Sequence, residues 1–297
     1  MAVPTAPTLV SITTEGLKKA GITTPTSAQL ARAQDEWMEE IKNDIWIIAK
    51  KLISLQTTTI QTLVNGQSRY SLPTDFSSII TMEILDGRVR GTAQAGSATS
   101  ITLASADTST DIIGSEIVIT AGTGQNSISR VTAFNTTTKV ATVAPSWTAP
   151  ASGSSYMIID TTYPLTEKTV VYLRSLGNAT NRDVPSWFYT AGDADDGEYE
   201  LYPIPYQSDS HVMACRITYY ADLMELDLAG TLMATLYKKW RNLFTQGVLM
   251  KTFQNDNESR AEKAATTYGG MLSSLIMREQ YGVDNSNLSC VVKDFRY

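Results

Sequence analysis

The stretch that decides the fold is the short β-type element Tyr70-Ser71-Leu72-Pro73-Thr74-Asp75-Phe76. Its counterparts come much later in the chain, and they read Glu198-Tyr199-Glu200-Leu201-Tyr202-Pro203-Ile204-Pro205 and Cys215-Arg216-Ile217-Thr218-Tyr219-Tyr220. Residues 88–160 between them are rich in Thr, Ser, Ala and Gly. This arrangement indicates a β scaffold that is interrupted by a second β module, whereas an enzyme site would be a local cluster of polar residues.

Short apolar strands separated by turn residues fill the interval 88–160. They are predicted at 101–103, 116–119, 127–131, 139–143 and 156–159. Strands at such intervals are typical of a small β-barrel or sandwich. The interval carries few charges, which fits a surface that docks by shape and hydrogen bonding, and fits a neutral exposed domain equally well.

The N-terminal part reads as helical over residues 12–54, with a short first helix at Thr13–Ala20 that ends at Gly21. Thr26 and Gln29 form a candidate capping box for the longer helix. Spacings of three and four place one set of apolar residues on a single face: Leu30, Ala33, Trp37, Ile41, Ile45, Ile48 and Leu52. The charged residues between them are predicted on the other face: Asp35, Glu36, Glu39, Glu40 and Lys42.

The chain then changes to β periodicity. Asn65-Gly66 is a strong hairpin signal between strands at 57–63 and 70–72, and another strand is predicted at 79–85. A helix is predicted at 163–176 with Thr166 as a possible cap, and β structure returns at 185–189 and 212–220. Pro203 and Pro205 cannot donate ladder hydrogen bonds and should mark a strand end or an edge.

Two C-terminal helices are predicted at 228–253 and 258–281. The basic run Lys238-Lys239-Trp240-Arg241 lies inside the first, and we interpret it as a solvated or intersubunit helix face. Helices from the two ends of the chain can cover each other's apolar faces only by packing together.

The predicted fold class is therefore α+β, with a helical bundle made by the N- and C-terminal helices and a central antiparallel β domain that carries an inserted small β-barrel or sandwich. The predicted domain organisation is residues 1–56 and 227–282 for the bundle, 57–87 and 161–226 for the central β domain, 88–160 for the insert, and 283–297 for a C-terminal tail.

Composition narrows the class of protein. The chain has 297 residues and a net charge of −6, which argues against a general nucleic-acid binder. No stretch approaches the roughly 20 apolar residues of a membrane span. The first residues lack the features of a signal peptide, so we expect a soluble protein that stays in the cytoplasm where it is made.

The residues with reactive side chains do not form an active site that the sequence can identify. Cys215 and Cys290 are expected to be free thiols, with Cys215 as a small core residue. A single histidine, His211, and the lack of a Cys-x-x-Cys motif argue against a structural zinc site. We predict no catalytic residue, no cofactor and no metal.

Two acidic patterns invite a functional interpretation. Asp193-Ala194-Asp195-Asp196-Gly197 resembles the start of a calcium loop, but its later positions do not supply the required ligands, and an exposed hairpin turn is favoured. Glu198 and Glu200 alternate with apolar residues and should lie on one strand face. The sequence gives no reason for a raised pKa at either carboxylate, which disfavours a glycosidase.

With these elements placed, the chain resembles the head-to-tail adaptor proteins of short-tailed phages. In that family a helical bundle from both chain ends flanks a β domain with a Tyr-x-Leu-Pro-x-Asp-Phe element, a Leu-x-Pro-x-Pro element and a strand ending in Tyr-Tyr. The matching residues are Tyr70, Leu72, Pro73, Asp75, Phe76, Leu201, Pro203, Pro205, Tyr219 and Tyr220. The insert is similar to a β module that recurs in phage virion proteins.

The resemblance implies a structural virion protein at the portal vertex of the phage tail. It implies a homo-oligomeric ring, typically of about twelve copies, between the portal protein and the tail nozzle protein, with tail fibres as further partners. Genomic DNA would pass through the ring without specific binding, and no membrane is involved. The tail would dock on the portal through its apolar residues Val291, Val292, Phe295 and Tyr297. The motif residues are structural, and core packing is the simplest role for their aromatic rings.

Two other functions compete with the adaptor. One is a tail or host-attachment protein whose module 88–160 binds glycan, with Trp147 and Tyr156 as candidate stacking residues, although each is more simply a core or turn residue. The other is an enzyme such as a peptidoglycan lysin, which the lack of a persuasive acid–base pair disfavours.

Overall fold

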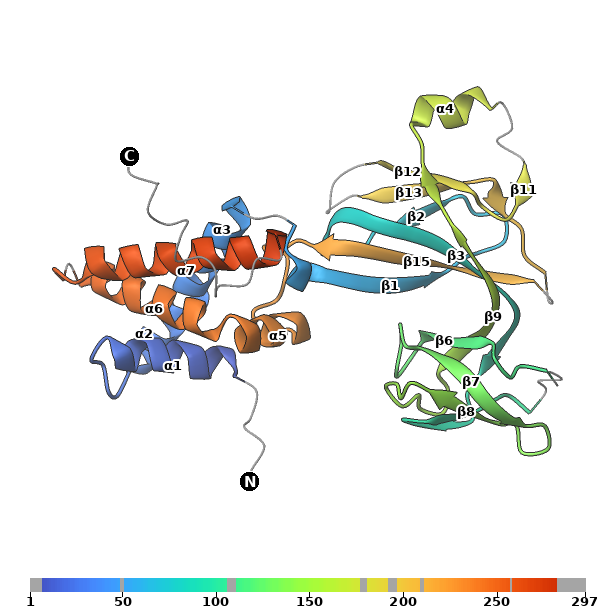
Figure 1. Cartoon of the computed structure of the whole chain (residues 1–297), viewed down its shortest axis with the longest axis horizontal. Coiled ribbons are helices and arrows are strands. Elements are labelled where there is room, and N and C mark those ends of the chain that lie inside the picture. Colours follow the sequence, from blue (N-terminus) through green and yellow to red (C-terminus); the bar gives the residue numbers. More distant parts are fainter. Residues whose placement is uncertain are drawn as a thin grey trace. The chain divides into compact units, whose positions relative to one another are not determined.

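The structure is a computed structural model that describes residues 7–48, 51–105, 111–176, 181–191, 197–208, 211–256 and 258–281 (Figure 1). It combines α-helices with a large curled sheet, so the chain is a mixed α+β protein, as predicted. The chain divides into two compact units, Met1–Gln56 with Tyr220–Tyr297, and Thr57–Tyr219. We call them the helical unit and the β unit.

Helices from both ends of the chain make up the helical unit. α6 (Arg241–Asn255) lies between α1 (Leu9–Lys19) and α7 (Ala261–Tyr281), and it also contacts α3 (Met38–Ile48) (Figure 1). The other helical elements of this unit are α2 (Ser27–Arg32), the π-helical turn η1 (Ala33–Trp37), the 3₁₀ turn η2 (Ile53–Leu55) and α5 (Thr231–Lys239). Within the described part of the chain, no helix has both the length and the apolar character that a membrane crossing requires.

Two glycines allow α6 to approach its neighbours closely. A Cβ atom at Gly16 of α1 would lie 2.7 Å from the side chain of Val248, and one at Gly247 would lie 2.6 Å from the side chain of Ile41. These distances are below normal contact, so larger residues at either glycine would push the helices apart.

Capping explains where the first two helices begin. The predicted capping box of Thr26 and Gln29 is confirmed at the start of α2. The first helix starts earlier than predicted, because Thr8 and Ser11 form a second capping box: the Ser11 amide donates to Thr8 Oγ1 (3.2 Å) and the Thr8 amide to Ser11 Oγ (2.8 Å).

The predicted long N-terminal helix is interrupted by η1. A π turn holds one residue more than an α turn, so the buried face shifts along the sequence after it. Ala33, Trp37, Ile41 and Ile45 are buried as predicted, and Met38 and Lys42 join them, whereas Ile48 is exposed. The placement of Lys42 on the outer face was therefore wrong: it is 1% exposed.

The predicted helix 228–253 is in fact two helices. α5 ends at Lys239 and α6 begins at Arg241, because Trp240 between them has a non-helical backbone (φ −113°, ψ 25°). The break lets the indole enter the interior, where it stacks on Phe244 with ring centroids 6.3 Å apart. The basic run is thus a helix junction and not a continuous helix face.

Gly270 offers a test of the outer face of α7. A Cβ atom there would have nothing within 4 Å, and the residue is exposed. Glycine in an exposed helix interior is less favourable than alanine by roughly 1 kcal/mol. We expect Gly270→Ala to raise the free energy of unfolding by about that amount in urea titrations followed by circular dichroism. A loss of stability would show that this face is not free in the isolated protein.

The described strands of the β unit form three sheets. The largest has the strand order β1-β15-β3-β9-β6-β7-β8-β5-β4, the second has β10-β12-β13-β2, and β11 pairs with β14. The strands are β1 (Gln56–Thr62), β2 (Arg69–Ser71), β3 (Phe76–Thr92), β4 (Ala95–Ser97), β5 (Ser100–Thr102), β6 (Glu116–Ala121), β7 (Ile128–Asn135), β8 (Val140–Ala144), β9 (Ser155–Pro164), β10 (Thr166–Glu167), β11 (Arg182–Asp183), β12 (Trp187–Ala191), β13 (Glu198–Tyr202), β14 (Ile204–Pro205) and β15 (Val212–Ala221).

The predicted hairpin at Asn65-Gly66 is wrong. Gly66 has the positive φ (79°) of a turn, but β1 and β2 do not pair with each other. β1 joins β15 in the large sheet, while β2 pairs with β13 in the four-stranded sheet. The turn therefore carries the chain from one sheet to another.

The five strands predicted within 88–160 are present, but they do not form a separate sheet. β3 and β9 pair antiparallel and both run across the predicted boundaries of the insert, so its strands extend the large sheet (Figure 1). β6 and β9 carry a hydrophobic core on each face. Ile117, Ile119, Tyr156 and Ile158 belong to a core made by residues 93–158, and Val118, Met157 and Ile159 belong to a core shared with Ile60, Leu85, Val212 and Ala214.

The predicted helix 163–176 is shorter than expected. β9 continues to Pro164 and β10 follows, so Thr166 lies in a strand and is not a cap. The helix α4 is Val170–Ser175, and Thr169 caps it by accepting a hydrogen bond from the Tyr172 amide (3.3 Å).

Candidate interaction surface

The two halves of the sequence motif meet where β2 pairs with β13. Tyr70 lies opposite Tyr199 in the register, and their rings stack with centroids 5.5 Å apart. The Tyr70 hydroxyl accepts from the Val64 amide (3.0 Å) and donates to the Gln67 carbonyl (3.0 Å), which holds the turn before β2. Both rings are buried, and burial raises the pKa of each phenol, so both stay protonated and serve as structural residues.

A second junction joins the same element to β15. The Tyr219 hydroxyl donates to Asp75 Oδ1 at 2.7 Å, and its ring contacts Phe76 with centroids 5.7 Å apart. Burial and the hydrogen bond to Asp75 raise the pKa of Tyr219. Segments that are far apart in the sequence are thereby fixed to each other through one carboxylate and two rings.

The remaining motif residues occupy strand ends and core positions. Leu72 and Leu201 are buried, and Pro73 ends the β2 segment. Pro203 follows the last residue of β13, and Pro205 ends the two-residue strand β14, so the prediction that these prolines mark strand ends is confirmed. Tyr220 is only half-buried and accepts a hydrogen bond from Gln56 Nε2 (3.3 Å).

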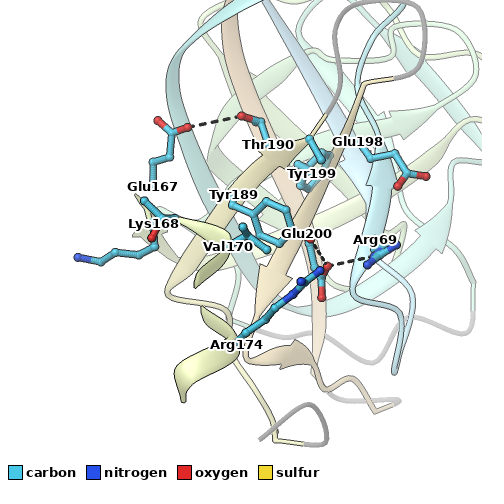
Figure 2. A pocket seen from close by; sticks show the side chains of 12 residues that line it. Arg69, Glu167, Lys168, Val170, Arg174, Tyr189, Thr190, Glu198, Tyr199 and Glu200 are labelled. Carbon is cyan, nitrogen blue, oxygen red and sulfur yellow. Dashed lines mark hydrogen bonds and ion pairs between the residues drawn. The ribbon is translucent and has the colours of Figure 1, made fainter. Parts of the chain in front are cut away.

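The four-stranded sheet also forms one wall of a concavity with a volume of about 650 Å³ (Figure 2). The residues that line it come from β2, β10, β12, β13, α4 and the two residues before α4. They include Arg69, Glu167, Lys168, Arg174, Tyr189, Glu198 and Glu200. We call it the sheet concavity. Its walls carry three basic and three acidic side chains, so its formal charges balance.

Glu200 organises the sheet concavity. Its Oε2 accepts from Arg69 Nε at 3.0 Å and from the Tyr189 hydroxyl at 2.7 Å, as Figure 2 shows. The register explains the contacts, because Arg69 and Tyr189 lie on either side of Glu200 in neighbouring strands. The hydrogen bond to Glu200 raises the pKa of Tyr189.

The geometry favours recognition of a polar surface. Glu198 and Glu200 line the same concavity, which confirms that they share a strand face. Glu200 is engaged by two donors, whereas Glu198 and Arg174 are exposed. Fixed charges of both signs on rigid strands can pair with charges of a docking protein, and they form the candidate contact surface of the β unit.

The aromatic residues proposed for glycan stacking lie in the interior. Tyr156 is fully buried, and its hydroxyl accepts a hydrogen bond from the Ala104 amide (3.0 Å). Trp147 is 9% exposed and its Nε1 donates to the Ser97 carbonyl (3.0 Å). The interpretation of both as core residues is confirmed, and the stacking role is wrong.

Other residues considered from sequence are placed as follows. His211 Nδ1 lies 3.2 Å from Asp86 Oδ1, at the entry to β15. No group of three or more potential metal ligands occurs among the described residues. The calcium-loop-like aspartates at 193, 195 and 196, Cys290, and the tail 283–297 with Val291, Val292, Phe295 and Tyr297 lie outside the described residues.

Cys215 should be chemically inert. It is fully buried, and burial raises the pKa of its thiol to about 12. Since the thiolate is the reactive form, alkylation of native Cys290→Ser protein by iodoacetamide near pH 8 should be roughly a thousandfold slower than in the denatured chain. Mass spectrometry over time measures this, and rapid labelling of the native protein would contradict the burial.

Sequence reasoning missed the basic residues of the sheet concavity. Lys168 and Arg174 lie in a segment that was predicted as one helix, and Arg69 precedes the motif. Alternation in β2 could have placed Arg69 on the face opposite Tyr70, but only the strand register sets it beside Glu200.

No protein-family model matches this sequence, and no curated protein matches it either.

Proposed function

We propose that this chain is a structural virion protein, a head-to-tail adaptor that forms a ring between the portal and the tail nozzle of a short-tailed phage. The observation that carries the proposal is the meeting of the separated motif elements. Tyr70 stacks on Tyr199, and Asp75 and Phe76 contact Tyr219, so the residues of the family resemblance act together as one scaffold.

The proposal includes the finer architecture of that family. The helices of the N-terminal 1–56 and C-terminal 227–282 segments form the bundle, residues 57–87 and 161–226 form the central β domain, and 88–160 is an inserted barrel-like module. The contacts of α6 with α1, α3 and α7 support the first part. The hydrophobic core made within residues 93–158 supports the last.

Each partner is assigned to a different region. The tail 283–297 docks on the portal protein, and the sheet concavity is a contact surface for the nozzle protein or tail fibres. The ring, of about twelve copies, then forms on the portal, and genomic DNA passes through it without sequence-specific contacts.

Electron microscopy of the purified protein, alone and mixed with its cognate portal, tests the proposal. We expect rings on the portal and none in the protein alone. Monomers that ignore the portal would overturn the adaptor function and favour a host-attachment protein.

Removing the tail tests its role separately. Burial of a few apolar side chains contributes about 1.5–3 kcal/mol each before ordering costs, so deletion of 283–297 should weaken portal binding at least tenfold in sedimentation assays. A scrambled tail of the same composition is the control. Normal binding by the deletion variant would contradict the tail's role and leave the adaptor proposal standing.

A further inference from the structure

The junction between α5 and α6 lines a second concavity, and this one is strongly basic. It has a volume of about 420 Å³ and lies in the helical unit, with α7 forming its other wall. Its basic side chains are Lys238, Lys239, Arg241 and Arg278, and none of the described residues that line it is acidic. In a chain with a net charge of −6, this clustering is a local reversal of sign.

The carboxylates nearby do not neutralise these cations. Glu279 is shared, because Lys239 lies 2.8 Å and Arg278 3.6 Å from its Oε1. Glu15 pairs with Arg241 at 2.7 Å. Lys238 is exposed and pairs with no acidic side chain in the described part of the chain. The two carboxylates thus pair with three of the four cations and leave Lys238 over, so an excess of positive charge remains for a ligand.

The backbone adds donors to the same concavity. α6 begins here without a side-chain cap and without an acidic residue in its first turn. The amide of Phe244 is the first to bond back, to the Trp240 carbonyl (3.2 Å), so the N–H groups of Arg241, Asn242 and Leu243 have no acceptor among the described residues. Free amides at a helix start bind oxyanions.

The indole of Trp240 provides an independent observation. Trp240 lines the concavity, its side chain is 2% exposed, and Nε1 has no hydrogen-bond partner within the described residues. Arg278 Nε, from the opposite wall, is likewise buried without a partner. Unsatisfied buried donors are uncommon in folded proteins, and two of them belong to residues that line this one concavity.

We propose that this concavity is a binding site for a phosphate group. Lys238 and Arg278 supply the charge, and the first amides of α6 donate to the phosphate oxygens. The phosphate comes either from a nucleic-acid backbone or from a free phosphate compound, and both offer the same oxygens. The site does not depend on the adaptor function, because it rests on the helical unit alone.

The exposure of the side chains makes the site testable without unfolding the protein. Lys239, Arg241 and Arg278 are 42%, 54% and 40% exposed, so they are accessible to a ligand. Lys238→Gln removes an exposed charge with no partner, and Arg278→Gln leaves Glu279 paired with Lys239. Lys263→Gln, an exposed lysine of α7 outside the concavity, is the matched control.

The experiment is a nuclear magnetic resonance titration of the full chain with inorganic phosphate, and separately with a short DNA duplex. We expect the amides of Asn242 and Leu243 and the Trp240 indole N–H to shift. The double variant Lys238→Gln/Arg278→Gln should weaken binding about tenfold or more, while Lys263→Gln leaves it unchanged. Shifts of the same signals by DNA, weakening with salt, identify a nucleic-acid backbone; shifts by phosphate alone identify a free phosphate compound.

Three results would overturn the proposal. One is that neither inorganic phosphate nor the DNA duplex shifts these signals. Another is an equal loss in the Lys263→Gln control, which would show only general charge attraction. The third is a response of these amides to a polyglutamate peptide and not to phosphate, which would assign the concavity to an acidic protein segment.

Discussion

Gly87→Ala should lower the free energy of unfolding of the β unit by about 3 kcal/mol, because strand β3 has no room for a side chain there. A Cβ atom at Gly87 would lie 2.1 Å from the carbonyl oxygen of Ile158 and 3.1 Å from its carbonyl carbon. Both atoms belong to the backbone of the paired strand, so no rotamer change can relieve the contact. The two strands would have to separate.

The position of Gly87 makes this separation costly. Gly87 lies at a register shift between β3 and β9. Strand β3 leads into the segment 88–160, and β9 leads out of it. β9 contributes Tyr156 and Ile158 to one hydrophobic core and Met157 and Ile159 to the other. A displaced β9 therefore disturbs the packing on both faces of the sheet.

Urea titrations followed by circular dichroism measure the effect. Thr81→Ala is the control, since Thr81 is an exposed residue of the same strand and its replacement should cost less than about 1 kcal/mol. A Gly87→Ala protein as stable as the control would mean that β3 and β9 do not pair in this register.

The sequence could predict the helices because their period is local. The apolar face through Ala33, Trp37, Ile41 and Ile45 is buried as expected. The prediction failed at Lys42, which is buried, and at Ile48, which is exposed, because the π turn before them shifts the phase of the buried face. Nothing in the residue types marks that turn. Trp240 is a similar case. Tryptophan is compatible with a helix, so the residue type does not predict the non-helical backbone that separates α5 from α6 at this position.

Strand partners were beyond the reach of the sequence. Asn65-Gly66 correctly signalled a turn, yet the hydrogen bonds of β2 go to β13, more than a hundred residues away along the chain. The same non-local register places Arg69 and Tyr189 around Glu200. Residues 117–119 and 156–159 are uniformly apolar because both faces of these segments are buried. This pattern does not reveal whether the strands extend an existing sheet.

The sequence motif predicted which aromatic residues are buried. Its separated aromatics were interpreted as core residues, and Tyr70, Phe76 and Tyr219 are indeed buried and in contact across strands. The physical reason is that a hydroxyl on a buried ring needs a partner, and Asp75 and the turn at Val64–Gln67 supply one to Tyr219 and Tyr70. A buried tyrosine and the polar partner of its hydroxyl can therefore be recognised as a motif in the sequence, even though the sequence does not reveal the strand register that brings them together.

Lys42→Ala should destabilise the helical unit by about 3 kcal/mol, since it removes a buried cation that bonds one carboxylate and two backbone carbonyls. Lys42 Nζ lies 3.0 Å from a Glu39 carboxylate oxygen and donates to the carbonyls of Met224 (3.2 Å) and Leu226 (2.9 Å). Glu39 is 43% exposed and can be solvated after the change, which keeps the loss at the lower end for a buried pair. The carbonyl of Leu226 is buried in this contact and would lose its partner.

Lys42→Met separates the charge from the packing. Methionine keeps an unbranched apolar side chain of similar length, so the packing around position 42 is largely retained. The Glu39 carboxylate and the carbonyls of Met224 and Leu226 still lose their donor. We expect it to recover some of the stability lost in Lys42→Ala but to remain about 2 kcal/mol below the wild type. Lys263→Ala, at an exposed position of α7, should change the stability by less than about 0.5 kcal/mol. If Lys42→Met matches the wild type in urea titrations, the ammonium contributes no net stability, and its desolvation offsets its three contacts; if it matches Lys42→Ala, the contacts account for the whole loss.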